Sequence, residues 1–455
     1  MSWHHKLLRV AAFTCLSVLV LAVPGQAVGG TSKPAPGPRL TTTQATALHA
    51  KVVHGTAASA TSALAFCKVH KLRCSAEVLA ARGGTKPLSS FTPFGFGARD
   101  LESAYHVAQA GGQAGTVAII DAGAYPTIES DLSAYRKQYG LPACLKSTGC
   151  LRVASFDGGP ERKPATSTIG RQIEEAVALE TALDLDMASA SCPKCKLILL
   201  QTRPWDAYAP SIADVHQAQL HFATGVATAK RMGADAVSIS YGYPTDSFST
   251  AAPAKMMNLT GIAVTASTGD SGYNGLFPPW PQVLPSVIAV GGTELSQASD
   301  KTWHEAVWDG GGSGCSAGYT PPAYGQPAWI ASLCNGNRAS ADISAVGDPQ
   351  TGVSVYTTYA PDSGFPLGWV VVGGTSVSSP LVAGLYARAG VSSATHGPNQ
   401  IYARPAADFN DVLAGANAPR GVCSADGVSE RICTADRGWD GPTGRGTPKG
   451  LATFR

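Results

Sequence analysis

The run Gly-Gly-Thr-Ser-Val-Ser-Ser-Pro at positions 373–380 constrains the fold of this chain more than any other feature. Its glycines let the backbone approach a ligand closely. The apolar segment 381–387 that follows predicts a buried helix, which places Ser376 near the start of that helix. The dipole and free backbone N–H groups there favour a developing oxyanion. Ser376 is therefore a candidate nucleophile, and the alternative is a serine that only caps the helix.

Apolar runs alternate with helical segments through the middle of the chain. The runs that predict strands are 116–121, 196–200, 234–241, 261–266 and 286–290, and the segments that predict helices are 128–139, 171–189 and 211–232. Strands that are apolar on both faces and alternate with helices indicate a parallel sheet covered on both sides. We therefore expect an α/β fold with three layers.

The first 27 residues have the pattern of a signal peptide. Lys6 and Arg9 precede an apolar run at 10–23, and residues 25–27 offer a small-x-small cleavage site. The run is short for a membrane span, so a retained anchor is the weaker alternative. No later segment has the apolar length of a transmembrane helix. We expect a secreted, monomeric chain without a membrane anchor once the signal is removed.

The composition limits the classes of partner that we expect. The net charge is only +3, and no lysine- or arginine-rich block occurs, so we expect no nucleic-acid partner. With 44% hydrophobic and 14% charged residues, the 455-residue chain can bury a large core.

The cysteines support export. Of 11 cysteines, Cys15 lies in the signal and ten remain. An even set with local spacing in an exported chain predicts disulfides. The expected pairs are Cys67/Cys74, Cys144/Cys150, Cys192/Cys195, Cys315/Cys334 and Cys423/Cys433. The alternative for the Cys-x-x-Cys at 192–195 is a redox or metal role.

Residues 28–95 differ from the rest, because they are rich in Thr, Ala, Ser, Pro and Gly and have weak periodicity. This composition predicts a prosegment or a loosely ordered arm. Residues 96–455 would form one catalytic domain.

A serine nucleophile needs a base within hydrogen-bond reach. Asp121 ends the first strand, but the only His-Gly-Thr string, at 54–56, precedes it and breaks the Asp, His, Ser order. The histidines between Asp121 and Ser376 are His216, His221 and His304, and we assign the first two to a surface helix face. A histidine-dependent mechanism is thus the weaker alternative.

The helix at 171–189 offers a different base. Glu180 and Asp184 stand at i and i+4, so they share one helix face among apolar neighbours. A buried pair of carboxylates has split pKa values, which suits proton transfer. The alternative is a solvated acidic face, to which Glu174, Glu175 and Asp186 would also belong.

A third carboxylate follows the strand 261–266. Asp270 lies in the turn Gly269-Asp270-Ser271-Gly272, at the edge of a parallel sheet where α/β sites form. It could also be an ordinary turn aspartate.

Together these segments resemble the sedolisins, the serine-carboxyl peptidases with a subtilisin-like fold. The matching pieces are Val117-Ala118-Ile119-Ile120-Asp121-Ala122, Glu180-x-x-x-Asp184, Gly269-Asp270-Ser271-Gly272, Ala289-Val290-Gly291-Gly292-Thr293 and Gly374-Thr375-Ser376. The resemblance implies that Ser376 is the nucleophile, Glu180 the general base and then acid, and Asp184 its support. Asp270 would donate a protonated carboxyl to the oxyanion, and Asp121 would be structural.

The resemblance implies further parts. Ser240, Tyr241 and Gly242 would form part of a substrate-binding edge. Residues 28–95 are shorter than the folded prodomain that sedolisin precursors usually carry.

The C-terminal region resembles the calcium loop of this family. The ligands would be the carboxylates of Asp411 and Asp440 and the carbonyls of Val412 and Gly438, with Asp436 standing where the family commonly has a glycine. Oxygen ligands of this kind suit one Ca²⁺ ion. The alternative is a disulfide-tied loop with a turn aspartate.

The sequence thus predicts an exported serine-carboxyl endopeptidase that acts on proteins or peptides at acid pH. The alternatives are a histidine-dependent subtilase and a non-catalytic binding protein on a peptidase scaffold.

Overall fold

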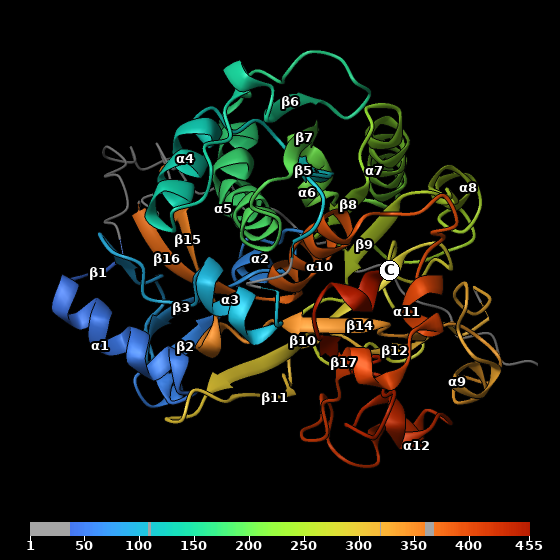
Figure 1. Cartoon of the computed structure of the whole chain (residues 1–455). Coiled ribbons are helices and arrows are strands. Elements are labelled where there is room, and N and C mark those ends of the chain that lie inside the picture. The colour runs from blue at the N-terminus through green and yellow to red at the C-terminus, as the bar shows by residue number, and fades with distance from the viewer. Residues whose placement is uncertain (1–36, 108–110, 319, 360–367) are drawn as a thin grey trace, which may run out of the picture.

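The computed structural model describes residues 37–107, 111–318, 320–359 and 368–455 (Figure 1). The signal peptide expected at 1–27 lies outside these ranges. Within them, no helix is both long enough and apolar enough to cross a bilayer.

A parallel sheet forms the centre of the described chain. Its strands are β5 (Thr116–Ala122), β6 (Leu151–Ser155), β7 (Lys196–Thr202), β8 (Ala236–Ile239), β9 (Ala263–Ser267), β10 (Ile288–Gln297), β11 (Trp303–Val307) and β14 (Ile343–Val346). They run in the order β11-β10-β9-β8-β5-β7-β6, with β14 also paired to β10. Only the β10–β11 pair is antiparallel among these strands.

Helices cover both faces of this sheet. The long ones are α4 (Ile128–Gln138), α5 (Thr168–Ser191), α7 (Ile212–Arg231) and α10 (Thr375–Ala389). On β5, Ile120 packs towards Gly225 of α7, whereas the next residue, Asp121, contacts Thr181 of α5. Neighbouring side chains of a strand point to opposite faces, so α7 and α5 lie on opposite sides. This is the α/β three-layer fold that the alternating pattern predicted.

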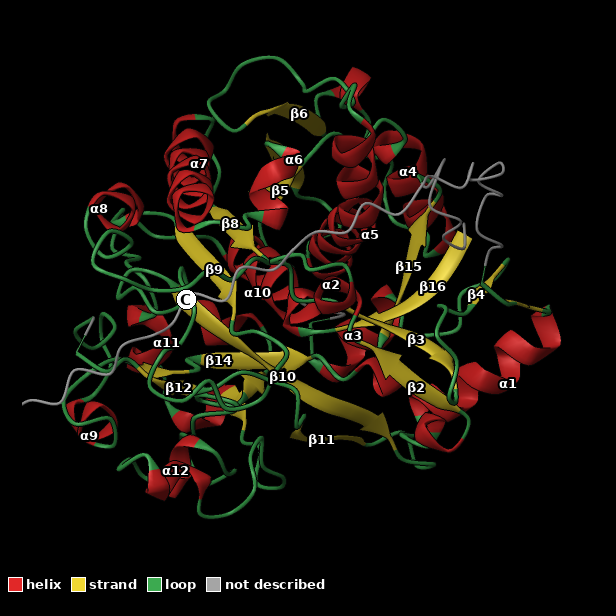
Figure 2. Ribbon diagram, turned by 180° about the vertical axis from the view of Figure 1, so that it is seen from behind, coloured by secondary structure: helices red, strands yellow, loops and turns green. Residues whose placement is uncertain are grey.

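A second sheet joins strands from residues 39–90 to strands from residues 353–373. It contains β1 (Arg39–Leu40), β2 (Thr61–Leu64), β3 (Glu77–Ala81), β4 (Ser89–Ser90), β15 (Val353–Thr357) and β16 (Gly368–Gly373). Strand β16, which leads into α10, pairs with β3, β4 and β15. Figure 2 shows α1 (Thr42–Val53) beside this sheet.

The N-terminal segment therefore differs from a loosely ordered arm. Residues 37–95 form helices and strands, and Ala45, Leu48, Val52 and Leu79 are buried against Val371 of β16 and its neighbours. The weak periodicity was misleading because these strands are only two to five residues long, and β3 and β4 pair with β16, which lies far along the chain. A role as prosegment stays a prediction.

The remaining elements are short. They are α2 (Phe66–Val69), α3 (Ala98–Ala104), α6 (Pro204–Tyr208), α8 (Ala252–Met257), α9 (Ala328–Ser332), α11 (Asn399–Ala403) and α12 (Val422–Ala425), and the strand pairs β12 (Gly314–Cys315) with β13 (Ala339–Ser340) and β17 (Phe409–Asn410) with β18 (Thr447–Pro448).

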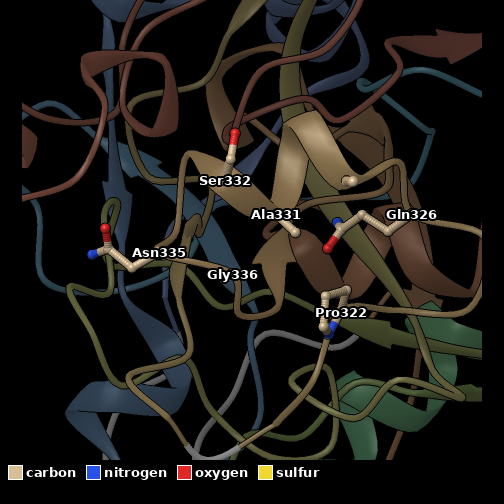
Figure 3. Close-up of a pocket in the computed structure, with 7 residues that line it drawn as sticks. Pro322, Gln326, Ala331, Ser332, Asn335 and Gly336 are labelled. Atoms are coloured by element: carbon tan, nitrogen blue, oxygen red, sulfur yellow. The ribbon is translucent and has the colours of Figure 1, made fainter.

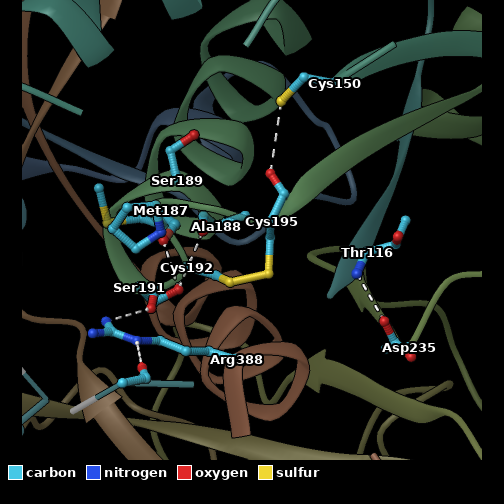
Figure 4. The surroundings of a disulfide bond; sticks show 12 residues. Thr116, Cys150, Met187, Ala188, Ser189, Ser191, Cys192, Cys195, Asp235 and Arg388 are labelled. Carbon is cyan, nitrogen blue, oxygen red and sulfur yellow. Dashed lines mark hydrogen bonds between the residues drawn. A yellow bond between two sulfur atoms is a disulfide. The ribbon is translucent and has the colours of Figure 1, made fainter. Parts of the chain in front are cut away.

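The structure contains the five disulfides that the cysteine spacing predicted. Cys192 and Cys195 are bonded to each other between the end of α5 and the start of β7, as Figure 4 shows. Beside them, Arg388 of α10 donates to the carbonyl oxygen of Ser191 at 3.2 Å. This Cys-x-x-Cys therefore joins two elements of the core instead of presenting free thiols.

Candidate active site

Ser376 is the second residue of α10, so it does not cap the helix. Gly374 occupies the N-cap position with φ +105°, a conformation that L side chains rarely adopt. A Cβ at Gly374 would also lie 2.2 Å from the carbonyl oxygen of Ser75 and 2.6 Å from Oδ2 of Asp270. Ser376 is fully buried, and its hydroxyl interacts with the carboxyl group of Glu180.

Three buried carboxylic acids gather next to this serine. Glu180 and Asp184 come from one face of α5, and Asp121 comes from the end of β5. Each is at most 1% exposed. The hydroxyl of Ser240 donates to Oδ1 of Asp184 at 2.9 Å.

Burial controls the protonation of this cluster. It raises the pKa of Glu180 well above its usual range, and the charge of Asp121 adds to the effect, while hydrogen bonding with the Ser376 hydroxyl acts to lower it. Burial and the charges of Asp121 and Glu180 likewise raise the pKa of Asp184. The pKa of Asp121 is raised to about 7, again by burial. The three acids therefore share protons, and Glu180 is the one in contact with the serine.

Asp270 lies in the turn after β9 and contacts Thr375, the residue before Ser376. The backbone N–H and the hydroxyl of Thr375 both donate to its Oδ1 at 2.8 Å. Its Oδ2 has no hydrogen-bond partner among the described residues and lies by Gly374. Burial raises the pKa of Asp270 to about 6. A protonated Oδ2 would donate a hydrogen bond at this place.

The predicted substrate-binding edge follows β8. Tyr241 is fully buried, and the backbone of Ser240 and Gly242 pairs with residues 73–75 of the N-terminal segment. The edge is therefore occupied by the chain itself.

The structure corrects two expectations about α5 and α7. Glu174, Glu175 and Asp186 do not form a solvated face, because each is at most 2% exposed. Backbone N–H groups hold two of them: Glu174 accepts two such bonds, and Asp186 accepts one from Tyr356. His221 is 8% exposed and so does not lie on a surface face. Helix α5 packs between the sheet, α4 and α10, which leaves no side of this segment in water.

No histidine named as a candidate base contacts Ser376 in the described residues. His216 and His221 each contact an aspartate carboxylate, at 2.7 and 2.8 Å. His304 is exposed on the edge strand β11, whereas Ser376 is fully buried. In the described part of the chain, carboxylic acids and not imidazoles surround the serine.

The acidic C-terminal residues lie close together. The N–H of Gly438 donates to both oxygens of Asp411, at 3.1 and 3.0 Å. Oδ2 of Asp440 accepts from the N–H of Asp436 at 3.0 Å. Burial raises the pKa of Asp440 to about 7, and the charge of Asp411 contributes. Two neighbouring carboxylates that repel each other fit a site for a hard cation. The carboxylate of Asp436 instead forms an ion pair with Arg431 at 3.3 Å.

A separate cavity adjoins α9 and is shown in Figure 3. It has a volume of about 500 Å³, and Gln326, Ser332 and Asn335 are its polar side chains. None of its lining residues titrates, so this cavity offers no acid–base group of its own.

The sequence did not predict the roles of two side chains. The Thr375 side chain anchors Asp270, and the Ser240 side chain anchors Asp184. The Gly-Thr-Ser string contained the first signal, but nothing in the sequence marks Ser240 as a partner of α5.

The three layers and the serine set among buried carboxylic acids define a subtilisin-like α/β protein. Comparison with known proteins agrees. Over 301 residues the chain is 29% identical to kumamolisin of Bacillus sp. (strain MN-32), covering 60% of this chain and 49% of kumamolisin. Over 208 residues it is 29% identical to sedolisin of Pseudomonas sp. (strain 101), covering 41% of this chain and 33% of sedolisin. It therefore spans about half, or less, of the length of these curated relatives.

A solved structure shares the fold. The complex of Pseudomonas sedolisin, a serine-carboxyl proteinase, with two molecules of pseudo-iodotyrostatin matches with a TM-score of 0.58 at 22% identity, covering 78% of this chain and 95% of that one. No family model matches the chain. The chain is thus similar in sequence to kumamolisin and sedolisin, and it shares the fold of the sedolisin structure.

Proposed function

We propose that this chain is an exported serine-carboxyl endopeptidase that hydrolyses protein or peptide substrates at acid pH. The observation that carries the proposal is the setting of Ser376, whose buried hydroxyl interacts with Glu180 and whose neighbour Thr375 holds Asp270. Its relatives kumamolisin and sedolisin support the same chemistry.

The arrangement suits acyl transfer. Ser376 attacks the peptide carbonyl carbon while Glu180 takes its proton, and Asp184 and Asp121 share the charge that results. The N–H of Ser376 and the protonated carboxyl of Asp270 stabilise the oxyanion. Glu180 then returns the proton to the leaving amine, and water hydrolyses the acyl-enzyme. The need for a protonated Asp270 favours acid pH, whereas the need for an ionised Glu180 sets the lower limit of the pH range.

We also propose one calcium ion at the C-terminal region, with Asp411 and Asp440 as its carboxylate ligands and the carbonyls of Val412 and Gly438 beside them. The proximity of the two carboxylates supports it. The ion would tie the loop together and take no part in the chemistry.

The test separates the carboxyl mechanism from its rivals. Hydrolysis of a quenched fluorescent peptide pool is measured for the full chain and for Ser376→Ala, Glu180→Gln and His216→Ala. Ser376→Ala should abolish activity, and Glu180→Gln should cost about 100- to 10,000-fold, the usual contribution of a general base. His216→Ala should act like the parent. Loss of activity in His216→Ala with full activity in Glu180→Gln would establish a histidine-dependent enzyme, and no hydrolysis by the parent chain would favour a binding protein.

A further inference from the structure

The first turn of α10 needs contacts from outside the helix to hold Ser376 in place. Ser376 is the second residue of α10, so its N–H has no partner in the helical ladder. Pro380 stands four residues later, inside the helix, and has no N–H to donate to the Ser376 carbonyl. The usual helical hydrogen bonds therefore do not fix Ser376, and its position depends on how the turn is attached to the sheet.

Ser378 attaches this turn to the end of β14. Its hydroxyl donates to the carbonyl oxygens of Val346 and Ala345, at 2.9 and 3.1 Å. Beside this contact, the N–H of Gly374 donates to the carbonyl oxygen of Gly347 at 2.6 Å. The last turn of chain before the nucleophile and the turn that contains it are thus bound to the same strand end.

Ser379 attaches the same turn to two further strands. Its hydroxyl lies 2.8 Å from the Ser238 hydroxyl of β8 and 3.0 Å from the Thr265 hydroxyl of β9. Thr265 also lies within reach of the Ser379 carbonyl oxygen, at 3.1 Å. All three side chains are fully buried. A buried hydroxyl is costly unless it is hydrogen-bonded, and a satisfied cluster specifies one arrangement of the elements that share it.

These two strands lead to the groups that must meet the nucleophile. Two residues beyond Ser238, the hydroxyl of Ser240 donates to Asp184, which supports the proposed base. Asp270 lies in the turn that follows β9. Helix α10 packs on β8, β9 and β14 together (Figure 1). The hydroxyl cluster therefore sets the distance from the first turn of α10 to the base on one side and to the oxyanion acid on the other.

We propose that Ser378 and Ser379 are positioning residues, which hold the Ser376 hydroxyl at Glu180 and the Ser376 N–H at the oxyanion. The proposal rests on the proposed function. Both hydroxyls bond to the sheet, so they act through the placement of Ser376 and transfer no proton themselves. A displacement of about 1 Å can cost about 100-fold in rate. Loss of either hydroxyl should lower kcat about 10- to 100-fold and leave KM within about twofold, because the substrate contacts remain.

The experiment measures kcat, KM and Tm at acid pH with one quenched fluorescent peptide that the full chain cleaves. The variants are Ser378→Ala, Ser379→Ala and a matched control, Ser191→Ala. Ser191 is a buried serine of α5, and its hydroxyl donates to the Met187 carbonyl of its own helix at 2.9 Å. All three variants should lower Tm by a similar amount, since each removes one buried hydrogen bond. Only the two substitutions in α10 should lower kcat.

Two substitutions of Thr265 guard against a serine variant that fails to fold. Thr265→Val removes the hydroxyl at nearly constant shape and should lower kcat, whereas Thr265→Ser keeps the hydroxyl and should retain most of kcat. Combining Ser379→Ala with Thr265→Val should cost less than the product of the two single losses, because both act through one cluster.

The outcomes separate this proposal from the proposed function. If the parent cleaves the peptide, unchanged kcat in Ser378→Ala and Ser379→Ala overturns the positioning role. An equal loss of kcat in Ser191→Ala, or a loss that appears only in KM, also overturns it. Losses that multiply in the double variant overturn the attachment through Ser379 and Thr265. Absence of hydrolysis by the parent overturns the proposed function as well.

Discussion

Replacing Asp270 tests the oxyanion assignment most directly. Asn is nearly isosteric: its Oδ1 can accept the two hydrogen bonds from Thr375, and its Nδ2 then takes the place of Oδ2 and donates. The pKa of Asp270 is raised to about 6. The donor form then falls from about 99% of molecules at pH 4 to about 1% at pH 8. The parent enzyme should lose roughly tenfold in rate per pH unit above 6.

The variants set the size of the effect. Asp270→Ala removes one oxyanion donor and leaves the Ser376 N–H, which should cost about 100- to 1,000-fold at pH 4, or roughly 2.7–4 kcal/mol. Since the parent itself loses about 100-fold by pH 8, the ratio of parent to Ala variant should shrink to within about tenfold there. Asp270→Asn should keep part of the activity and lack the alkaline decline.

The assay is kcat/KM for a quenched fluorescent peptide pool across pH 3–9. Thr375→Val is the matched control, because it deletes a hydroxyl bond that lowers the pKa of Asp270 and should move the alkaline decline to higher pH. An alkaline decline that persists unchanged in Asp270→Asn, or full activity in Asp270→Ala, would refute the reasoning.

Three further outcomes are expected. A chelator should lower Tm, because a ligand bound only to the folded state stabilises it, and Asp440→Ala should remove that sensitivity; an unchanged Tm in the parent argues against a bound ion. Burial and the charge of Asp270 raise the pKa of Glu77 from 4.5 to about 8, so stability present below pH 4.5 is lost as pH rises towards 8. Glu77→Gln should therefore raise Tm at pH 8 and leave it unchanged at pH 4 in scanning fluorimetry. Thiol titration of the denatured, unreduced secreted chain should find essentially no thiol, and reactive Cys192 and Cys195 would contradict the disulfide assignment.

Local patterns predicted the central sheet well. Strands β5 and β7 and helices α5 and α7 differ from the expected segments by three residues or fewer at each end, because long apolar runs and helical periodicity are encoded where they occur. The position of Ser376 near the start of α10 was predicted from the short Gly-Thr-Ser string and the apolar run after it.

The second sheet and the contact of a disulfide with Glu180 were not predictable in this way. Strand β16 pairs with Val78, almost 300 positions earlier, and no local pattern encodes such a pairing. The pairing of Cys67 with Cys74 was visible in the spacing, but its position against Glu180 depends on the tertiary fold. The burial of His221 was also not predictable from the sequence. Its partner Asp206 lies on α6, and that helix is too short to recognise from periodicity.

The disulfide that lies on Glu180 has a consequence for proton balance. The Sγ of Cys67 lies 3.9 Å from Oε2 of Glu180, within the buried surroundings that raise the pKa of that carboxyl. By linkage, acid stabilises the folded arrangement around Glu180, and this stability is lost as pH rises through the window between the unfolded and folded pKa values. Glu77, whose pKa is raised to about 8 on the same segment, acts with the same sign. Residues 67–77 are thus packed most firmly against α5 at the acidity at which Asp270 is protonated.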